Sequence, residues 1–243
     1  PAGAAAVVSL YERGTISKQS AERALRFCNN SGPGFFLGVA GGMVLDSIPA
    51  GLVLYGIHVL SALCAGVLLA SRDVPRAALK KLRPQEPLTL SRAFSEAVSG
   101  SCAALLQISA LVIFFTAMTA LLQRALPSLP AQGLLTGLLE LTSGITQLKG
   151  DWNTRFLCCA FLLGWGGVCV HFQASSLWSA AGLHPRGYWT EKLLHGLLCL
   201  LFAAAFLSKH PAVLALAGVI IGFCAIFPFL RKKRGGNPRS VVV

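Results

Sequence analysis

Long runs of apolar residues separated by short polar breaks make up most of this chain. Runs of about 20 apolar residues are typical of helices that cross a lipid bilayer. We interpret four of the runs as membrane-spanning helices, at residues 50–70, 97–126, 193–207 and 212–230. The pattern therefore predicts an all-α fold, a polytopic transmembrane helical bundle.

Other segments are too short or too polar to span a bilayer. We interpret residues 35–45 as a half-helix or as one arm of a re-entrant hairpin, and residues 134–148 and 156–170 are also short. Residues 13–26 have apolar positions at helical spacing and a cap signal at Ser17, which predicts a helix on the membrane surface. The bundle is thus expected to contain broken or re-entrant helices.

Two polar or glycine-rich breaks lie inside the most hydrophobic parts of the chain, at residues 29–34 and 164–167. Lipid offers no hydrogen bonds to open backbone, so such breaks survive at membrane depth only where protein or a water-filled cavity satisfies them. Paired interruptions in two parts of a chain point to a transporter-like site near the middle of the bilayer.

Few residues of the chain are charged, and the basic residues outnumber the acidic ones. Only 12% of the residues are charged, against about 25% in soluble domains, while the formal net charge is +12. The basic residues gather in a loop at 72–96 and in a tail at 231–243, which is typical of cytoplasmic segments of membrane proteins. Aromatic residues do not interleave with them as a nucleic-acid platform requires, so we expect no nucleic-acid partner.

Placing both basic segments in the cytoplasm constrains the topology. The chain must then cross the membrane an even number of times between residue 97 and the tail, whereas five apparent segments lie there. One segment between residues 134 and 177 is therefore expected to turn back or to fail to cross.

A weak similarity between two parts of the chain suggests how it is organised. Residues 26–27 followed by 35–42 resemble residues 155–156 followed by 161–167, which indicates either an inverted repeat or chance similarity of glycine-rich runs. The division expected from this is a first half at 1–71, the basic loop at 72–96, a second half at 97–230 and the basic tail at 231–243.

Glu140 is the most informative single residue, because a carboxylate within an apolar run is functional by default. It could bind a cation, carry a proton or hold a polar ligand. The alternative is a glutamate that faces water at the interface or is locked to Lys149 or Arg155. The neighbouring polar residues that could share its site are Thr142, Ser143, Thr146 and Gln147.

Two further polar groups lie at the breaks. Asn29, Asn30 and Ser31 precede the half-helix, where their side chains and the free helix end could bind a polar molecule, or could simply shape a turn. His171 and Gln173 follow the second break and could complete a polar site, although a histidine at the interface is the alternative.

The remaining candidates have structural interpretations. His58 is expected to be a packed hydrogen-bond donor between helices, and Asp46 a helix cap. The cysteines form no CxxC pair, and the spacing of the histidines indicates no metal site. Because no catalytic or nucleotide-binding motif is present, we expect neither an enzyme nor a cofactor.

Several segments together carry a family resemblance. Residues 11–17 (YERGTIS), 21–23 (AER) and 27–33 (FCNNSGP) closely resemble the YlbJ family of sporulation integral membrane proteins, part of the nucleoside recognition, or Gate-domain, group. Residues 140–144 (ELTSG) and 166–173 (GGVCVHFQ) are similar to its C-terminal motifs. Residues 1–4 (PAGA) look like the tail of a family motif whose start is missing, so we expect the chain to be incomplete at its N-terminus.

The resemblance implies a multi-pass protein of the forespore or mother-cell membrane with a role in making the spore cortex. Gate domains occur in iron transporters and are similar to parts of nucleoside transporters, which implies a transporter-like function. The partners expected are the lipid bilayer, a polar small molecule or an ion, and a second copy of the chain. The competing hypothesis is a membrane scaffold for cortex assembly that transports nothing.

Overall fold

The computed structural model of this chain describes residues 2–69, 89–127, 131–208 and 210–234, and these contain helices but no strand. The predicted all-α bundle is therefore confirmed for the described residues. Most of the basic loop expected at 72–96, and residues 235–243 of the basic tail, lie outside them.

The chain begins with a short helical hairpin. Helices α1 (Ala2–Glu12) and α2 (Lys18–Cys28) are joined by a turn in which Gly14 has a φ of 75°, a conformation that favours glycine. The hydroxyl of Ser17 accepts a hydrogen bond from the amide of Ser20 and caps α2, as the sequence predicts. The predicted helix at 13–26 therefore starts later than expected.

A second hairpin follows the first break. Helix α3 (Pro33–Phe35) continues directly into a wide π-helix, η1 (Phe36–Val44), and α4 (Ile48–Leu68) runs back against it. A side chain at Gly51 would come within 2.5 Å of the Phe36 carbonyl oxygen, so these backbones touch only because glycine lies there. The short helix predicted at 35–45 is confirmed.

The turn between η1 and α4 corrects one prediction. The cap of α4 is Ser47, whose hydroxyl accepts a hydrogen bond from the amide of Ala50 at 3.3 Å, rather than Asp46. Asp46 instead takes a left-handed backbone conformation with a φ of 50°, which places it in the turn before the cap.

The helix expected at 97–126 is longer than predicted. Helix α5 (Leu90–Ala125) has 36 residues and starts after Thr89, whose hydroxyl accepts a hydrogen bond from the Arg92 amide. Residues 90–96, which the sequence analysis placed in the basic loop, therefore belong to α5.

The segment at 134–148 turns back on itself, as the crossing argument required. Helices α6 (Gln132–Leu139) and α7 (Leu141–Thr146) pack as a hairpin with Glu140 at its tip. A side chain on Gly144 would lie 2.0 Å from the backbone of Gly137, so the two arms are in direct backbone contact. Neither arm is long enough to cross a bilayer.

The segment predicted at 156–170 is part of a longer broken helix. Helices α8 (Trp152–Trp165) and α9 (Val168–Ala180) are separated by Gly166 and Gly167, with φ values of 93° and 79°. Together they form a 29-residue candidate span, Trp152–Ala180. The predicted segment already ran through the glycine pair, but it was too short at both ends, because polar residues precede Phe156 and follow Val170.

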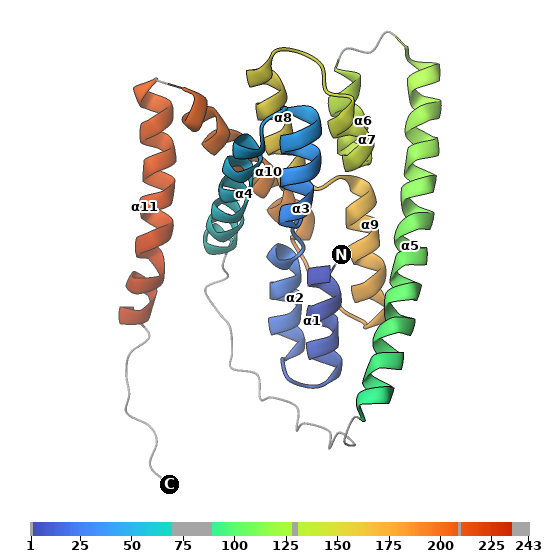
Figure 1. Cartoon of the computed structure of the whole chain (residues 1–243). Coiled ribbons are helices and arrows are strands. Elements are labelled where there is room, and N and C mark those ends of the chain that lie inside the picture. Colours follow the sequence, from blue (N-terminus) through green and yellow to red (C-terminus); the bar gives the residue numbers. More distant parts are fainter. Residues whose placement is uncertain (1, 70–88, 128–130, 209, 235–243) are drawn as a thin grey trace.

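Helices α10 (Tyr188–Leu207) and α11 (Pro211–Arg234) complete the chain. In the described residues, four helical segments are long and apolar enough to cross a membrane: α4, α5, α8–α9 and α10. The apolar part of α11, Pro211–Phe227, is shorter than these, so the span predicted at 212–230 is not among them. The start of α5 and the end of α11 lie at the same end of the bundle, as they would if α11 also crosses (Figure 1).

The structure changes which residues of the two similar parts correspond to each other. Figure 1 shows α2 and α3–η1 following one another along the bundle, as α8 and α9 do in the opposite direction. The similarity detected in the sequence matched Gly41 and Gly42 with Gly166 and Gly167. However, Gly41 and Gly42 lie inside η1 and not at a break. That sequence register is therefore wrong, although each part contains an interrupted helix followed by a long one.

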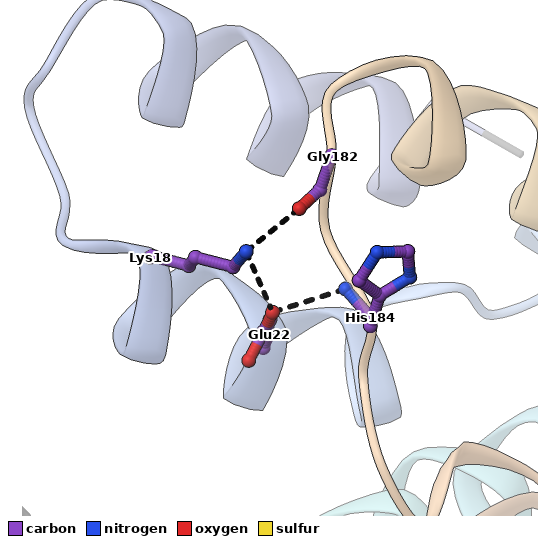
Figure 2. Close-up of polar contacts among 4 residues, drawn as sticks. All are labelled: Lys18, Glu22, Gly182 and His184. Atoms are coloured by element: carbon purple, nitrogen blue, oxygen red, sulfur yellow. Dashed lines mark hydrogen bonds and ion pairs between the residues drawn. The ribbon is translucent and has the colours of Figure 1, made fainter.

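A polar cluster holds α2 against the connection between α9 and α10 (Figure 2). The Lys18 ammonium donates a hydrogen bond to the Gly182 carbonyl at 2.8 Å, and the Glu22 carboxylate accepts one from the His184 amide at 3.0 Å. Lys18 and Glu22 also form an ion pair at 3.9 Å. These contacts, with an apolar cluster that includes Leu25 and Trp178, fix the α1–α2 hairpin on the rest of the bundle.

Candidate functional site

A cavity of about 370 Å³ lies where the three interruptions of the fold meet. The break after α2, the tip of the α6–α7 hairpin and the break between α8 and α9 all contribute to its wall. Its volume falls within the range of small-molecule sites. Seven of the residues predicted for the site line it: Asn29, Asn30, Ser31, Glu140, Thr142, His171 and Gln173.

Lys192 of α10 is the cation at this cavity that the sequence reasoning missed. Only 3% of it is exposed, and its ammonium donates hydrogen bonds to the carbonyl oxygen of Asn29 at 2.6 Å and to Oδ1 of Asn30 at 3.3 Å. The bond to the Asn29 carbonyl satisfies open backbone at the first break, which lipid cannot do. Since an ammonium has three donors, one remains for a further acceptor.

His171 is held in an aromatic enclosure. It is 1% exposed, its Nδ1 lies 2.9 Å from the Tyr188 hydroxyl, and the rings of Trp165 and Trp189 pack edge-on to it. His171 is therefore enclosed by protein side chains rather than exposed on the surface of the bundle. Its second nitrogen, Nε2, is buried without a hydrogen-bond partner in the described part of the chain.

Glu140 organises the hairpin tip. It is 2% exposed, and its two carboxylate oxygens accept hydrogen bonds from the amides of Thr142 at 3.0 Å and Ser143 at 2.6 Å, which caps α7. The alternatives of a water-facing glutamate or a lock to Lys149 or Arg155 are therefore wrong, since Arg155 donates to the Val44 carbonyl instead. A carboxylate that caps its own hairpin also carries a negative charge into the cavity wall.

Two predicted residues lie away from the cavity. Ser143 contributes its amide to the Glu140 cap without lining the cavity. Gln147 lies at the far end of the hairpin, where its Oε1 accepts a hydrogen bond from Gln123 at 2.8 Å. It was grouped with Glu140 because the two are close in sequence, but the helix between them places them at opposite ends of α7.

Gln173 lines the cavity but is directed along its own helix, donating to the Cys169 sulfur at 3.4 Å. Asn29 is 6% exposed, and its Nδ2 has no hydrogen-bond partner among the described residues. Asn29 and Lys192 therefore bring donor nitrogens with unused capacity to the cavity. Nε2 of His171 adds a third donor in the tautomer whose Nδ1 accepts from the Tyr188 hydroxyl.

An ion pair lies directly beside this site. Glu191, next to Lys192 in α10, approaches Arg26 of α2 with 3.4 Å between a carboxylate oxygen and Nε. The sequence placed the start of this span at residue 193, so both charged residues looked like flanking groups. The helix instead begins at Tyr188, which carries Tyr188, Glu191 and Lys192 into the bundle.

The comparisons with known proteins agree with the sequence motifs. No protein-family model matches the chain, and no solved structure matches it. The chain is 24% identical to the sporulation integral membrane protein YlbJ of Bacillus subtilis (strain 168) over 242 residues, a match that covers 83% of this chain and 59% of YlbJ. The chain thus spans less than two thirds of the length of this curated relative. The similarity confirms the expected resemblance to the sporulation integral membrane protein YlbJ, and the apolar helices are those of a multi-pass membrane protein.

Proposed function

We propose that the chain forms the ligand-binding core of a transporter-like protein that acts in sporulation. The observation that carries the proposal is the cavity at which two broken helices and a hairpin tip converge. Interrupted helices that meet at membrane depth place backbone and polar side chains where a ligand can replace water. The proposal involves binding and movement of a molecule, and no catalysis.

The donors in the wall suggest the class of ligand. Lys192, Asn29 and His171 offer nitrogens to an acceptor, and leaving such groups unpaired in a buried site is costly. A molecule with carboxylate, phosphate or carbonyl oxygens would satisfy them. The apolar walls at Phe35, Leu163 and Trp165 favour an organic molecule over a bare ion.

The family resemblance supplies the biological setting of the proposal. From the resemblance we propose a Gate-domain arrangement and a place in the forespore or mother-cell membrane. We also propose a role in forming the spore cortex. An even number of crossings between the two basic segments would put them on one side of the membrane, and the excess of Lys and Arg favours the cytoplasmic side.

Replacement of Lys192 by methionine tests the proposal. The change removes the charge and its hydrogen bonds but nearly keeps the length and volume of the side chain. The Asn29 carbonyl loses its donor, but it lies at the cavity, where water can take the place of the ammonium. Lys149→Met is a matched control, because Lys149 is exposed and does not line the cavity.

The two variants are introduced into the protein in its own sporulating host, and heat-resistant spores and protein abundance are measured. The proposal predicts that Lys192→Met is present at normal abundance but fails to make resistant spores, whereas Lys149→Met behaves as the wild type. Normal sporulation with Lys192→Met would contradict a ligand-binding role and favour the scaffold hypothesis.

A further inference from the structure

Two histidines and a cysteine meet in the core between α4 and α10. His58 lies on α4, while His195 and Cys199 lie four residues apart on one face of α10. One ligand atom from each residue lies within 4.8 Å of the others, and the two imidazole rings are 4.5 Å apart. The three residues are at most 2% exposed. We call them the His58 cluster.

The polar groups of this cluster are poorly satisfied by the protein. Both ring nitrogens of His58 are buried and have no hydrogen-bond partner in the described residues. Ser61, one turn further along α4, is fully buried, and its hydroxyl lies beside the Cys199 thiol. Unpaired polar groups in the middle of a membrane helix carry a large energetic penalty, so they indicate a ligand that pairs with them.

One contact prepares His195 for ligation. Its Nε2 lies 3.0 Å from the backbone carbonyl oxygen of His58, where it can only donate. The proton on Nε2 leaves the lone pair on Nδ1. A ligating histidine usually fixes its ring in this way, by donating its other nitrogen to a carbonyl or carboxylate oxygen.

We infer that the His58 cluster binds a late first-row transition metal, with Zn²⁺ as the ion that best fits two imidazoles and one thiolate. Tetrahedral zinc needs nitrogen and sulfur atoms about 3.3–3.8 Å apart, given bond lengths of about 2.0–2.3 Å. The donor atoms therefore need to close by about 1 Å. The fourth position would be taken by water or by the hydroxyl of Ser61.

Charge imposes one requirement on the site. Lys192 lies one turn before His195 on α10, and its positive charge opposes a bound cation. The ammonium is directed to Asn29 and Asn30, and a thiolate at Cys199 would offset part of the metal charge. Binding should therefore release the thiol proton and depend strongly on the sulfur.

The position of the cluster gives the metal a mechanical role. A bound ion would link α4 to α10 near the first break, because His58 also lines a small cavity with Asn30 and Ser31. The inference does not depend on the proposed transport function, since it concerns a different set of residues and a different ligand.

Cobalt titration of the purified full chain in detergent tests the inference. Co²⁺ replaces zinc in thiolate sites and reports the sulfur by a charge-transfer absorption band, and Zn²⁺ is then added to displace it. The variants are Cys199→Ser and His58→Gln, and Cys159→Ser is the matched control, since Cys159 is equally buried but lies on α8 outside the cluster. Metal content is measured by mass spectrometry, and folding by gel filtration.

The expected result is one cobalt per chain with a sulfur band that Zn²⁺ removes. The band should disappear in Cys199→Ser and remain in Cys159→Ser, and zinc should bind His58→Gln at least about 100-fold more weakly, since outer contacts alone are worth 10–100-fold. The inference is overturned if the folded wild type takes up no stoichiometric cobalt. A sulfur band that is unchanged in Cys199→Ser overturns it equally, because the metal would then be on another cysteine.

Discussion

The α6–α7 hairpin provides a sharp test of the packing that builds the candidate site. Gly144 faces Gly137 so closely that an added Cβ would lie 2.0 Å from the Cα and the amide nitrogen of Gly137, and 2.8 Å from the Gly133 carbonyl oxygen. All of these are backbone atoms, so no side-chain rotation can relieve the contact. Gly144→Ala should therefore force the arms apart and displace Glu140.

The magnitude follows from two opposing effects. Alanine stabilises a helix by about 1 kcal/mol relative to glycine. Overpacking of a rigid contact costs about 3 kcal/mol at the upper end of its usual range. The net loss for Gly144→Ala is then about 2 kcal/mol or more, which corresponds to a fall of roughly 4–8 °C in the unfolding temperature.

Gly56 is the matched control. It is exposed on α4 and an added Cβ would meet no atom within 4 Å, so Gly56→Ala should gain up to about 1 kcal/mol from helix propensity alone. The assay is the temperature at which the purified protein in detergent loses its monodisperse gel-filtration peak. The reasoning is refuted if Gly144→Ala is as stable as the wild type, or if both variants shift in the same direction.

Three further predictions follow from single contacts. Glu140→Gln should leave the protein inserted and abundant but reduce sporulation. The amide keeps one oxygen for the α7 cap but has no charge. Normal yields of heat-resistant spores would reject a role for the charge. Glu22→Ala should destabilise the protein by about 1 kcal/mol and increase amide hydrogen exchange around His184. Glu22→Gln keeps an acceptor oxygen and should have a smaller effect. Equal hydrogen exchange in the wild type and both variants would contradict the structural role of the contacts among Lys18, Glu22 and His184. Cysteines introduced at Ser91 and Lys233 in a cysteine-free background should react with an impermeant reagent from the same side of the membrane, and labelling from opposite sides would disprove the even number of crossings.

Much of the architecture could be predicted because it depends on apolar length. The runs that became α4 and α5 were recognisable from hydrophobicity, and the crossing argument correctly identified a segment that turns back. The continuity of α8 and α9 was not predictable, because Gly166 and Gly167 give the same local signal whether a helix ends or only bends. Tertiary contacts with the α6–α7 hairpin decide between these outcomes, since a Cβ added at Gly167 would lie only 3.1 Å from the Leu141 amide nitrogen.

The site was only partly visible in the sequence. Asn29, Glu140 and His171 stood out because polar residues within apolar runs are informative. Lys192 was missed because a lysine near a predicted span end is usually an interfacial anchor, and only the true start of α10 shows that it is buried. The His58 cluster was missed because His58 is far in sequence from α10, although the spacing of His195 and Cys199 on one helix face was a usable signal.

The central claim is that the buried nitrogens at the meeting point of the broken helices hold a polar molecule in the membrane. It is tested most directly by native mass spectrometry of the protein extracted from sporulating cells in lipid nanodiscs. The account predicts one small molecule with carboxylate, phosphate or carbonyl oxygens per chain in the wild type and in Lys149→Met, and none in Lys192→Met. A ligand-free wild type, or the same bound molecule in Lys192→Met, would contradict it.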